Sequence, residues 1–334
     1  MPPDDPGVSA PSPVERYDDG ILALDTLTGG MDTVTAGFLL AAPRPALIEC
    51  GPAKSIGSVV AGLRGLGFDP DDLAYVVLTH IHLDHAGGAG DLAAAFPHAT
   101  IVVSEVGAPH LHDPARLNTS ARRVYGSLYD EVYGDCTPID RSRILGVADG
   151  DRLDLGGGRE LELLYTPGHA KHHVGVHDSA TGAIFSGDSV GVKLPGMTHI
   201  RPATPPADFH LEAALRSLAR YREREPSRVY LAHYGPVDPP AEALEEADER
   251  LRLWAATAES AYRDAIAGGP TGTELDHVAE TLQHRFASEI DVSAVADPAR
   301  AQERVELLSG YTSNAAGLIR YFQRREAGTL TEVG

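Results

Sequence analysis

Short apolar runs broken by polar turns fill the first third of the chain, and this alternation predicts strands connected by turns and helices. The runs that we interpret as strands are 21–24, 37–41, 46–48, 73–78 and 100–104. Residues 55–66 carry apolar side chains at a helical spacing, and 92–96 predict a short helix that ends at Pro97. We therefore expect strands and helices to alternate along this part of the chain.

A second set of strands begins at Val147, and three of them run directly into a tight, glycine-rich turn that carries a polar side chain. The three strand and turn pairs are 161–165 with TPGH (166–169), 183–185 with SGDS (186–189), and 229–231 with AHYG (232–235). Because each turn follows a strand at once, we expect its polar side chain at the same edge of the sheets as the others.

Two stretches of the chain have a helical rather than a strand pattern. Residues 109–135 interrupt the strands and carry His110 and His112. They fit either a helical insertion that shapes a pocket or a segment with ordinary surface histidines. After Pro240, apolar residues recur every three or four positions through 244–266, which predicts a long amphipathic helix. Thr271 and Glu274 are spaced as a capping box for a further helix, and a last helix is expected over 305–322.

These patterns divide the chain into four parts. The proline-rich residues 1–15 predict a disordered leader, and residues 327–334 a tail. Residues 16–238 contain all the predicted strands and form the main domain, while 239–326 form a helical C-terminal extension. The extension either packs on the main domain, roofs a substrate pocket or forms a homodimer interface, because the helical period shows an apolar face but not what that face meets.

Composition narrows the classes of partner. The 334 residues carry 48 acidic and 28 basic side chains, a formal net charge of -20, and such an anionic surface repels nucleic acid. The sequence contains no apolar run long enough for a membrane span and no signal peptide, so we expect a cytoplasmic protein that acts on a small molecule. Cys50 and Cys136 are too far apart for a CxxC motif, and we assign them no role.

The strongest chemical signal is the motif THIHLDH at residues 79–85, directly after the strand expected at 73–78. Side chains two apart on an extended segment point the same way, so His80 and His82 can share one metal ion. Asp84 and His85 fall where Gly87 and Gly88 indicate that the chain has turned back, and they offer a carboxylate and an imidazole beside the first pair. The motif therefore predicts a metal site with room for a second ion.

Together with the turns of the second strand set, the motif gives a full candidate ligand set. One ion would be held by His80, His82 and His169, the other by Asp84, His85 and His233, with Asp188 between them. Five imidazoles and two carboxylates without a thiolate suit zinc, iron or manganese. We expect two divalent ions, with zinc as the first expectation and iron or manganese as alternatives.

The motifs THIHLDH, TPGH, SGDS and LAHYG, in this order and each after a strand, resemble those of the metallo-β-lactamase-fold hydrolase superfamily over residues 17–238. The resemblance implies an α+β fold, a four-layer αββα sandwich with a dinuclear site between its two sheets. It also implies supporting or substrate contacts for Glu49, which stands where the family usually has Asp, and for His173. Asp188 in place of a cysteine argues against a typical β-lactamase, and the acidic charge argues against the RNA-processing and nuclease branches.

The leading hypothesis is a dinuclear metal-dependent hydrolase of small esters, thioesters or lactones. In such an enzyme two cations make a bridging hydroxide available near neutral pH, and Asp84 orients it and passes a proton to the leaving group. A mononuclear iron oxidoreductase similar to persulfide dioxygenases is the first alternative, and a phosphodiesterase is the second. A non-catalytic metal-binding or partner-binding protein also stays open.

Overall fold

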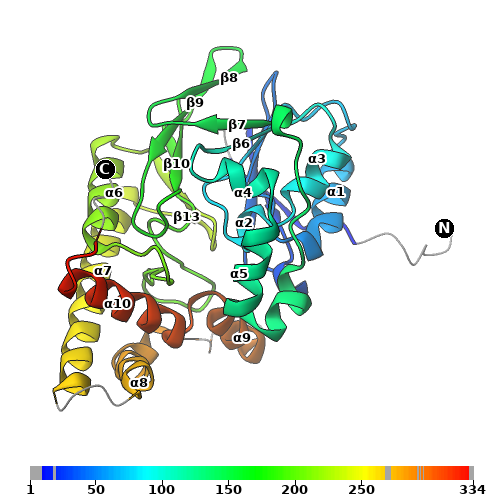
Figure 1. Ribbon diagram of the computed structural model, residues 1–334. Helices are drawn as coiled ribbons and strands as arrows, with labels where there is room; N and C mark the ends of the chain where they lie inside the picture. The colour runs from blue at the N-terminus through cyan, green and yellow to red at the C-terminus, as the bar shows by residue number, and fades with distance from the viewer. Residues whose placement is uncertain are drawn as a thin grey trace. The chain divides into compact units, whose positions relative to one another are not determined.

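The computed structural model describes residues 10–17, 20–267, 272–291, 293, 295 and 297–330 (Figure 1). The chain forms two compact units, one made of the residues up to Tyr165 together with Val174–Phe185, the other made of Thr166–His173 and the residues from Ser186 onward. The strands belong to two sheets, one with β1 to β7 and one with β8 to β13. Among the described residues, no helix is both long and apolar enough to cross a membrane.

The first sheet lies in the first unit and follows the order of the sequence. Its strands are β1 (Val14–Arg16), β2 (Ile21–Asp25), β3 (Ala36–Leu40), β4 (Ala46–Ile48), β5 (Tyr75–Val77), β6 (Thr100–Ser104) and β7 (Ile144–Val147). Strands β1 to β4 pair antiparallel, whereas β4 to β7 pair parallel, with Ile48 opposite Val77 and Val77 opposite Val102. Parallel pairing brings the carboxyl ends of β4 and β5 to the same edge, and these ends lead into Glu49 and the THIHLDH motif.

Helices α1 (Ile56–Gly65) and α3 (Ala89–Ala95) cover this sheet (Figure 1). Val59 and Leu63 of α1 and Leu92 of α3 share one buried apolar cluster with Leu47 and Val76 of the sheet. The single turn α2 (Leu83–Ala86) holds the second half of the motif. The alternation of strands and helices expected from the sequence is therefore confirmed in this unit.

The structure differs from the predicted leader of residues 1–15. Residues 1–9 lie outside the described residues, but Val14–Arg16 form β1, which pairs with β2 through Val14 opposite Leu24. The prolines that suggested disorder end at Pro13, whose carbonyl accepts a hydrogen bond from the Asp25 backbone N–H at 2.9 Å. Proline lacks a donor but not an acceptor, so it can stand at the start of an edge strand.

The insertion at 109–135 is helical, as predicted. It contains α4 (Ala108–His112), α5 (Ala115–Tyr125) and the π-helical turn Tyr129–Tyr133. A groove of about 670 Å³ in the first unit is lined by residues of this insertion, including His110 and His112, and by Ile144 of β7. Short 3₁₀ turns among the described residues include Thr28–Gly30, Ala53–Ser55, Arg141–Arg143 and Ala287–Glu289.

The remaining strands pair antiparallel within each unit. The first unit contributes β8 (Arg152–Gly156), β9 (Arg159–Tyr165), β10 (Val174–Asp178) and β11 (Ala183–Phe185). The second unit contributes the hairpin of β12 (Arg228–Leu231) and β13 (Gly235–Val237). Each of the turns TPGH, SGDS and AHYG follows one of these strands, as the sequence pattern predicted.

Helices make up most of the second unit. They are α6 (Leu211–Glu223), α7 (Pro240–Ile266), α8 (Glu274–Phe286), α9 (Pro298–Ser309) and α10 (Tyr311–Glu326). Helices α7, α8 and α10 pack on one another (Figure 1), and the Trp254 ring stacks between Phe286, at 4.7 Å, and Tyr311, at 5.8 Å. The change from strands to helices falls where we predicted it, because β13 ends at Val237 and α7 begins at Pro240. The domain boundaries themselves stay a prediction.

Two details of the helical region differ from expectation. The single helix predicted over 305–322 is wrong, because Gly310, with ψ 145°, separates α9 from α10. The apolar period continues across this break, which is why the pattern alone did not reveal it. The capping box cannot be compared, since Thr271 lies outside the described residues; α8 begins at Glu274 with Thr273 at its N-cap. Of the predicted tail, Ala327 to Leu330 are described and 331–334 are not.

Candidate metal centre

The THIHLDH motif is held by the end of β5 and by its neighbours. The Leu78 N–H donates to the Val102 carbonyl at 2.8 Å, and the Thr79 carbonyl accepts from the Val174 N–H at 2.8 Å. The backbone stays extended through His82, with φ -64° and ψ 151°, and then enters the helical turn α2 that carries Asp84 and His85. The sequence prediction of an extended half followed by a turn matches this backbone.

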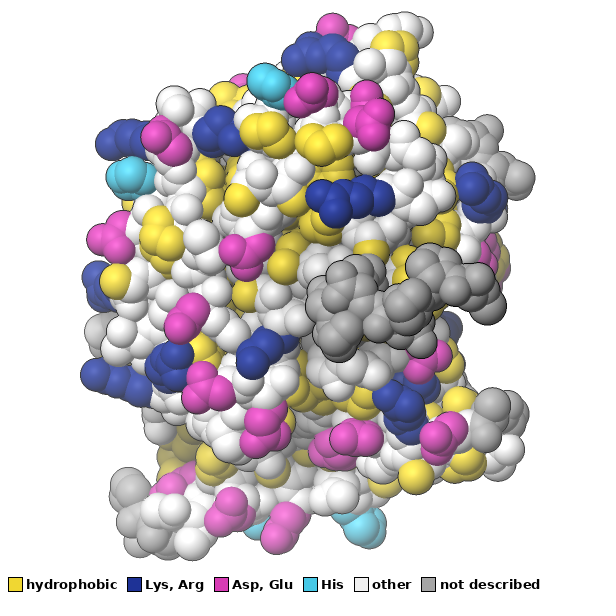
Figure 2. Space-filling model, turned by 90° about the vertical axis from the view of Figure 1, so that its right-hand side faces the viewer, with side chains coloured by type: hydrophobic (Ala, Val, Ile, Leu, Met, Phe, Trp, Pro, Cys, Tyr) yellow, Lys and Arg dark blue, Asp and Glu magenta, His cyan; other side chains and the backbone are white. Residues whose placement is uncertain are grey.

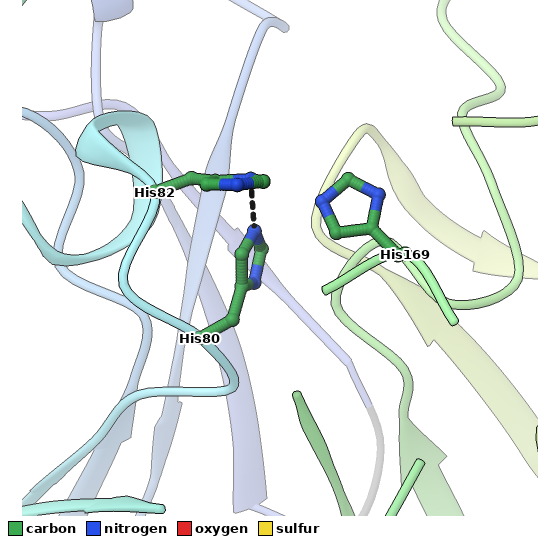
Figure 3. A group of neighbouring side chains, drawn as sticks. All are labelled: His80, His82 and His169. Atoms are coloured by element: carbon green, nitrogen blue, oxygen red, sulfur yellow. Dashed lines mark hydrogen bonds between the residues drawn. The ribbon is translucent and has the colours of Figure 1, made fainter. Parts of the chain in front are cut away.

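The imidazoles of the motif gather into one cluster in the first unit. His80 Nε2 lies 3.0 Å from His82 Nδ1, as the dashed line in Figure 3 marks; the same view draws His169, which belongs to the other unit. The His80 and His85 rings are 4.1 Å apart between centroids, and His85 Nε2 is 3.5 Å from Asp84 Oδ2. His80 and His85 are completely buried. The cluster therefore offers several nitrogens and a carboxylate at close range.

Glu49 supports this cluster from the end of β4. Its carboxylate accepts hydrogen bonds from the hydroxyl and, at 3.4 Å, from the backbone N–H of Thr79, and Oε1 lies 3.4 Å from His85 Nδ1. Thr79 in turn joins its hydroxyl to His80 Nδ1 at 3.0 Å. Glu49 is buried and has a left-handed φ of 63°, a conformation that non-glycine residues adopt at a cost. We interpret this strain as the consequence of aiming the carboxylate at Thr79 and His85.

A second group of candidate ligands lies in the second unit, around Asp188. One carboxylate oxygen, Oδ2, is 3.5 Å from His169 Nε2, and the other, Oδ1, is 3.3 Å from His233 Nε2. All three side chains are at least nine-tenths buried. The two oxygens of Asp188 thus face two different imidazoles.

The backbone around this second group fixes His169. His169 Nδ1 donates to the Ala203 carbonyl at 3.0 Å, which leaves Nε2 on the side of Asp188. Gly168, with φ 136°, makes the turn before His169, and a Cβ there would lie 2.3 Å from the Ala214 backbone. Only glycine satisfies both the torsion angle and this close approach.

His173 contacts the Asp188 turn rather than open solvent. Its ring is completely buried, its Nε2 accepts from the Asp188 backbone N–H at 3.3 Å, and its Nδ1 lies 3.0 Å from the Thr166 hydroxyl. Tyr221 extends this network by bonding the hydroxyls of Thr166, at 3.1 Å, and Ser189, at 2.7 Å. Burial raises the pKa of the Tyr221 phenol to about 12, so it stays a neutral hydrogen-bonding group.

The sequence analysis missed Thr79, Thr166 and Tyr221 as supporting residues. The two threonines stand immediately before the motif residues His80 and Pro167, and a polar residue that ends an apolar strand was a signal available in the sequence. Tyr221 has no such signal, because it lies in the last turn of α6 and reaches Thr166 across 55 positions.

The donor groups fit metal ions. Two ligands that each lie about 2.0–2.1 Å from a tetrahedral ion are roughly 3.3 Å apart. The nitrogen–oxygen distances from Asp188 to His169 and His233, and from Asp84 to His85, are 3.3–3.5 Å. The donor atoms of Glu49, His80 and His85 all lie within 4.8 Å of one another. Buried imidazoles and carboxylates at this spacing are what a divalent-ion site requires.

The two cysteines take no part in this chemistry. Both are buried and form no disulfide. Burial raises the pKa of the Cys50 thiol well above its usual range and that of Cys136 to about 12. A thiol that stays protonated at neutral pH is neither a nucleophile nor a ready metal ligand.

Comparison with known proteins identifies the family. Residues 34–233 match the family model of the metallo-β-lactamase superfamily, and the chain belongs to this superfamily. The predicted fold is thereby confirmed: an α+β sandwich with two sheets, the metallo-β-lactamase fold, with an added helical C-terminal region. Members of the superfamily typically bind divalent metals such as zinc, and this chain carries candidate ligands for them.

The relatives include proteins from archaea and bacteria. The chain is 37% identical over 173 residues to the metallo-β-lactamase fold-containing protein ST1585 of Sulfurisphaera tokodaii, which covers 51% of this chain and 63% of that protein. A solved structure of ST1585 from Sulfolobus tokodaii has a TM-score of 0.60 at 29% identity, covering 71% of this chain and 87% of that one. An N-acyl homoserine lactonase of Bacillus thuringiensis is 27% identical over 183 residues, 52% of this chain and 61% of the lactonase. The sequence matches to ST1585 and to the lactonase thus span under two thirds of each relative.

Proposed function

We propose that the protein is a dinuclear metal-dependent hydrolase of small esters, thioesters or lactones. One observation carries the proposal: the two carboxylate oxygens of Asp188 face two different imidazoles, at 3.5 and 3.3 Å. A carboxylate in this arrangement suits a bridge between two ions, and it favours two ions over the single iron of the oxidoreductase alternative. The N-acyl homoserine lactonase among the relatives supports an ester or lactone substrate.

The proposed ligand set follows the order of the motifs along the chain. His80, His82 and His169 hold one ion, Asp84, His85 and His233 hold the other, and Asp188 bridges them. The order of the motifs along the chain and the close donor spacing within each group support this assignment. Zinc is the first expectation for both ions, and iron or manganese are the alternatives. Glu49 and His173 orient the ligands through Thr79, His85 and the Asp188 turn.

Bound at this site, two divalent ions would make hydroxide available near neutral pH and polarise the scissile carbonyl. The chain's own residues then have to orient the attacking oxygen and supply a proton to the leaving group. Asp84 suits both tasks, because its carboxylate lies beside the His85 imidazole, with Oδ2 3.5 Å from Nε2, and a carboxylate can accept a proton and return it. Asp84 is therefore the proposed catalytic residue.

A groove in the second unit suits a small substrate. It has a volume of about 1020 Å³, and its lining includes Tyr234, which follows His233 in the sequence. Its apolar lining includes Leu194, Met197 and Val237. Five carboxylates line it as well, against one lysine and one arginine: Asp238, Glu242, Glu245, Glu246 and Glu249.

The surface charge argues against the phosphodiesterase alternative and against nucleic acid as a partner. The groove carries more negative than positive side chains, and the whole chain has a formal net charge of -20. On the face presented in Figure 2, Lys and Arg side chains stand among Asp and Glu rather than in a continuous patch. A phosphate-rich ligand would be repelled by such a surface.

Replacing Asp84 by Asn tests the mechanism. The amide keeps the size of the side chain but cannot carry a proton to the leaving group, so turnover of a chromogenic ester or lactone should fall by about 10²–10⁴-fold. Metal content, measured by elemental analysis of the same preparation, should fall far less. The exposed Asp276→Asn in α8 serves as the control and should change neither quantity. Equal losses of turnover and metal in Asp84→Asn would show that Asp84 is only a ligand.

A further inference from the structure

Helix α10 of the C-terminal region is bonded to the loop 201–204 through Asn314. The Thr204 backbone N–H donates to Asn314 Oδ1 at 2.8 Å. The Thr204 hydroxyl lies 2.8 Å from the same oxygen and 3.1 Å from the Asn314 carbonyl. Both side chains are buried, so these bonds are shielded from water. One residue of α10 thus fixes both the backbone and the side chain of Thr204.

The same loop is pressed against α10 at two further points. A Cβ on Gly317 would lie 1.9 Å from the Thr204 carbonyl oxygen, so the helix backbone approaches the loop as closely as only glycine permits. Arg201, which is almost fully buried, donates from Nη2 to the Tyr311 hydroxyl at 3.0 Å. Its guanidinium lies over the Tyr311 ring at 4.6 Å. The loop is therefore held on both sides of Ala203.

Ala203 connects this contact to the candidate metal centre. Its carbonyl accepts the hydrogen bond from His169 Nδ1 at 3.0 Å. This bond fixes the tautomer that carries its proton on Nδ1, orients the ring, and leaves Nε2 facing Asp188 at 3.5 Å. Because Ala203 precedes Thr204 directly, the position that α10 imposes on Thr204 also sets the position of the carbonyl that holds His169.

We propose that helix α10 is a positioning element for His169, and that it acts through Asn314, Thr204 and the Ala203 carbonyl. This inference rests on the proposed function, since it assumes that His169 is a metal ligand. It gives the helical C-terminal extension a role in the metal centre that is separate from roofing a pocket or forming a dimer. Asn314 and Thr204 are positioning residues, not catalytic ones.

Zinc titration of the metal-free 334-residue chain against a chromogenic chelator tests this inference. Thr204→Val replaces the hydroxyl by a methyl of similar size, and it should weaken binding of one of the two zinc ions by about 10–100-fold. Asn314→Ala should do the same. Thr204→Ser retains the hydroxyl and should keep the affinity of the parent.

Phe322→Leu is the matched control. Phe322 is a buried residue of α10 that stacks on Tyr262 of α7, at 5.9 Å, so its replacement loosens α10 without removing a bond to the loop. The zinc affinity of Phe322→Leu should stay within about 3-fold of that of the parent, even if its thermal midpoint is lowered as much as the midpoint of Thr204→Val. Circular dichroism of each variant verifies that it is folded.

Two results would overturn the inference. One is unchanged zinc affinity in both Thr204→Val and Asn314→Ala. The other is a loss of zinc affinity in Phe322→Leu equal to that in Thr204→Val when the two variants have the same thermal midpoint. If the parent binds two zinc ions and hydrolyses an ester while Thr204→Val binds zinc equally well, only the role of α10 is refuted. If the parent binds no metal at all, the proposed function and the role of α10 are refuted together.

Discussion

Replacing Glu49 by Gln tests whether its carboxylate orients the imidazoles of the first unit for metal binding. The carboxylate of Glu49 accepts two hydrogen bonds from Thr79 and lies 3.4 Å from His85 Nδ1. Glutamine keeps the length of the side chain and one carbonyl oxygen, but it loses the negative charge beside His85. The variant therefore changes the electrostatics of the cluster with little change in volume.

The magnitude follows from what Glu49 touches. A carboxylate that orients a metal-ligating histidine typically contributes 10–100-fold to metal affinity, or about 1.4–2.7 kcal/mol. Glu49 bonds Thr79, which joins His80, and it also pairs with His85, so it reaches one proposed ligand of each ion. We expect Glu49→Gln to weaken the binding of both zinc ions by at least tenfold, measured by competition with a chromogenic chelator.

The chain offers a matched control in the same unit. Glu162 on β9 lies opposite His177 on β10, with Oε2 3.6 Å from Nδ1, and both residues lie outside the THIHLDH motif. Glu162→Gln removes the same kind of Glu–His contact and should leave zinc affinity unchanged. If Glu49→Gln bound zinc as tightly as the parent, or if Glu162→Gln weakened binding to the same extent, the reasoning about Glu49 would be refuted.

Two predictions concern stability. Arg159→Met should lower the free energy of unfolding by about 3–5 kcal/mol, because it leaves the buried carboxylate of Asp178 without its cationic partner. The two oxygens of Asp178 accept hydrogen bonds from Arg159 at 2.9 and 2.7 Å. Arg152→Met, which breaks the exposed pair with Glu160 on the same hairpin, should cost less than about 1 kcal/mol, and equal costs in urea unfolding would contradict the argument. The pKa of the Cys136 thiol rises from 9.0 to about 12 on folding, so the unfolded chain releases this proton first and stability falls as the pH rises above 9. Between pH 8 and pH 10.5, the free energy of unfolding measured in urea should therefore fall by about 2 kcal/mol more in the parent than in Cys136→Ala. Equal decreases in the two proteins would refute this role of Cys136.

Much of the fold could be predicted because its signals are local. The apolar runs that precede His80, His169 and His233 fix the ends of strands, and ligand types in the following turns need no knowledge of distant residues. Strand β1 and the break at Gly310 escaped this reasoning for a physical reason. A three-residue edge strand is too short to show a period, and α9 and α10 continue one apolar period across their break.

The supporting contacts of the site could be predicted less well, since they join residues far apart in the sequence. His169 meets the Ala203 carbonyl across 34 positions, and Thr204 meets Asn314 across 110. The Ala203 contact uses a backbone carbonyl, which every residue possesses, so no side-chain pattern marks it. Glu49 was predicted from the family resemblance, because it stands where the family usually has Asp, but its left-handed backbone and its bonds to Thr79 required coordinates.

The most direct test of the central claim is elemental analysis of protein purified without added metal, combined with a panel of chromogenic esters, thioesters and lactones. We expect two zinc, manganese or iron atoms per chain and hydrolysis that a chelator abolishes and added metal restores. One iron atom per chain with no hydrolysis, together with oxygen uptake in the presence of persulfides, would contradict this claim.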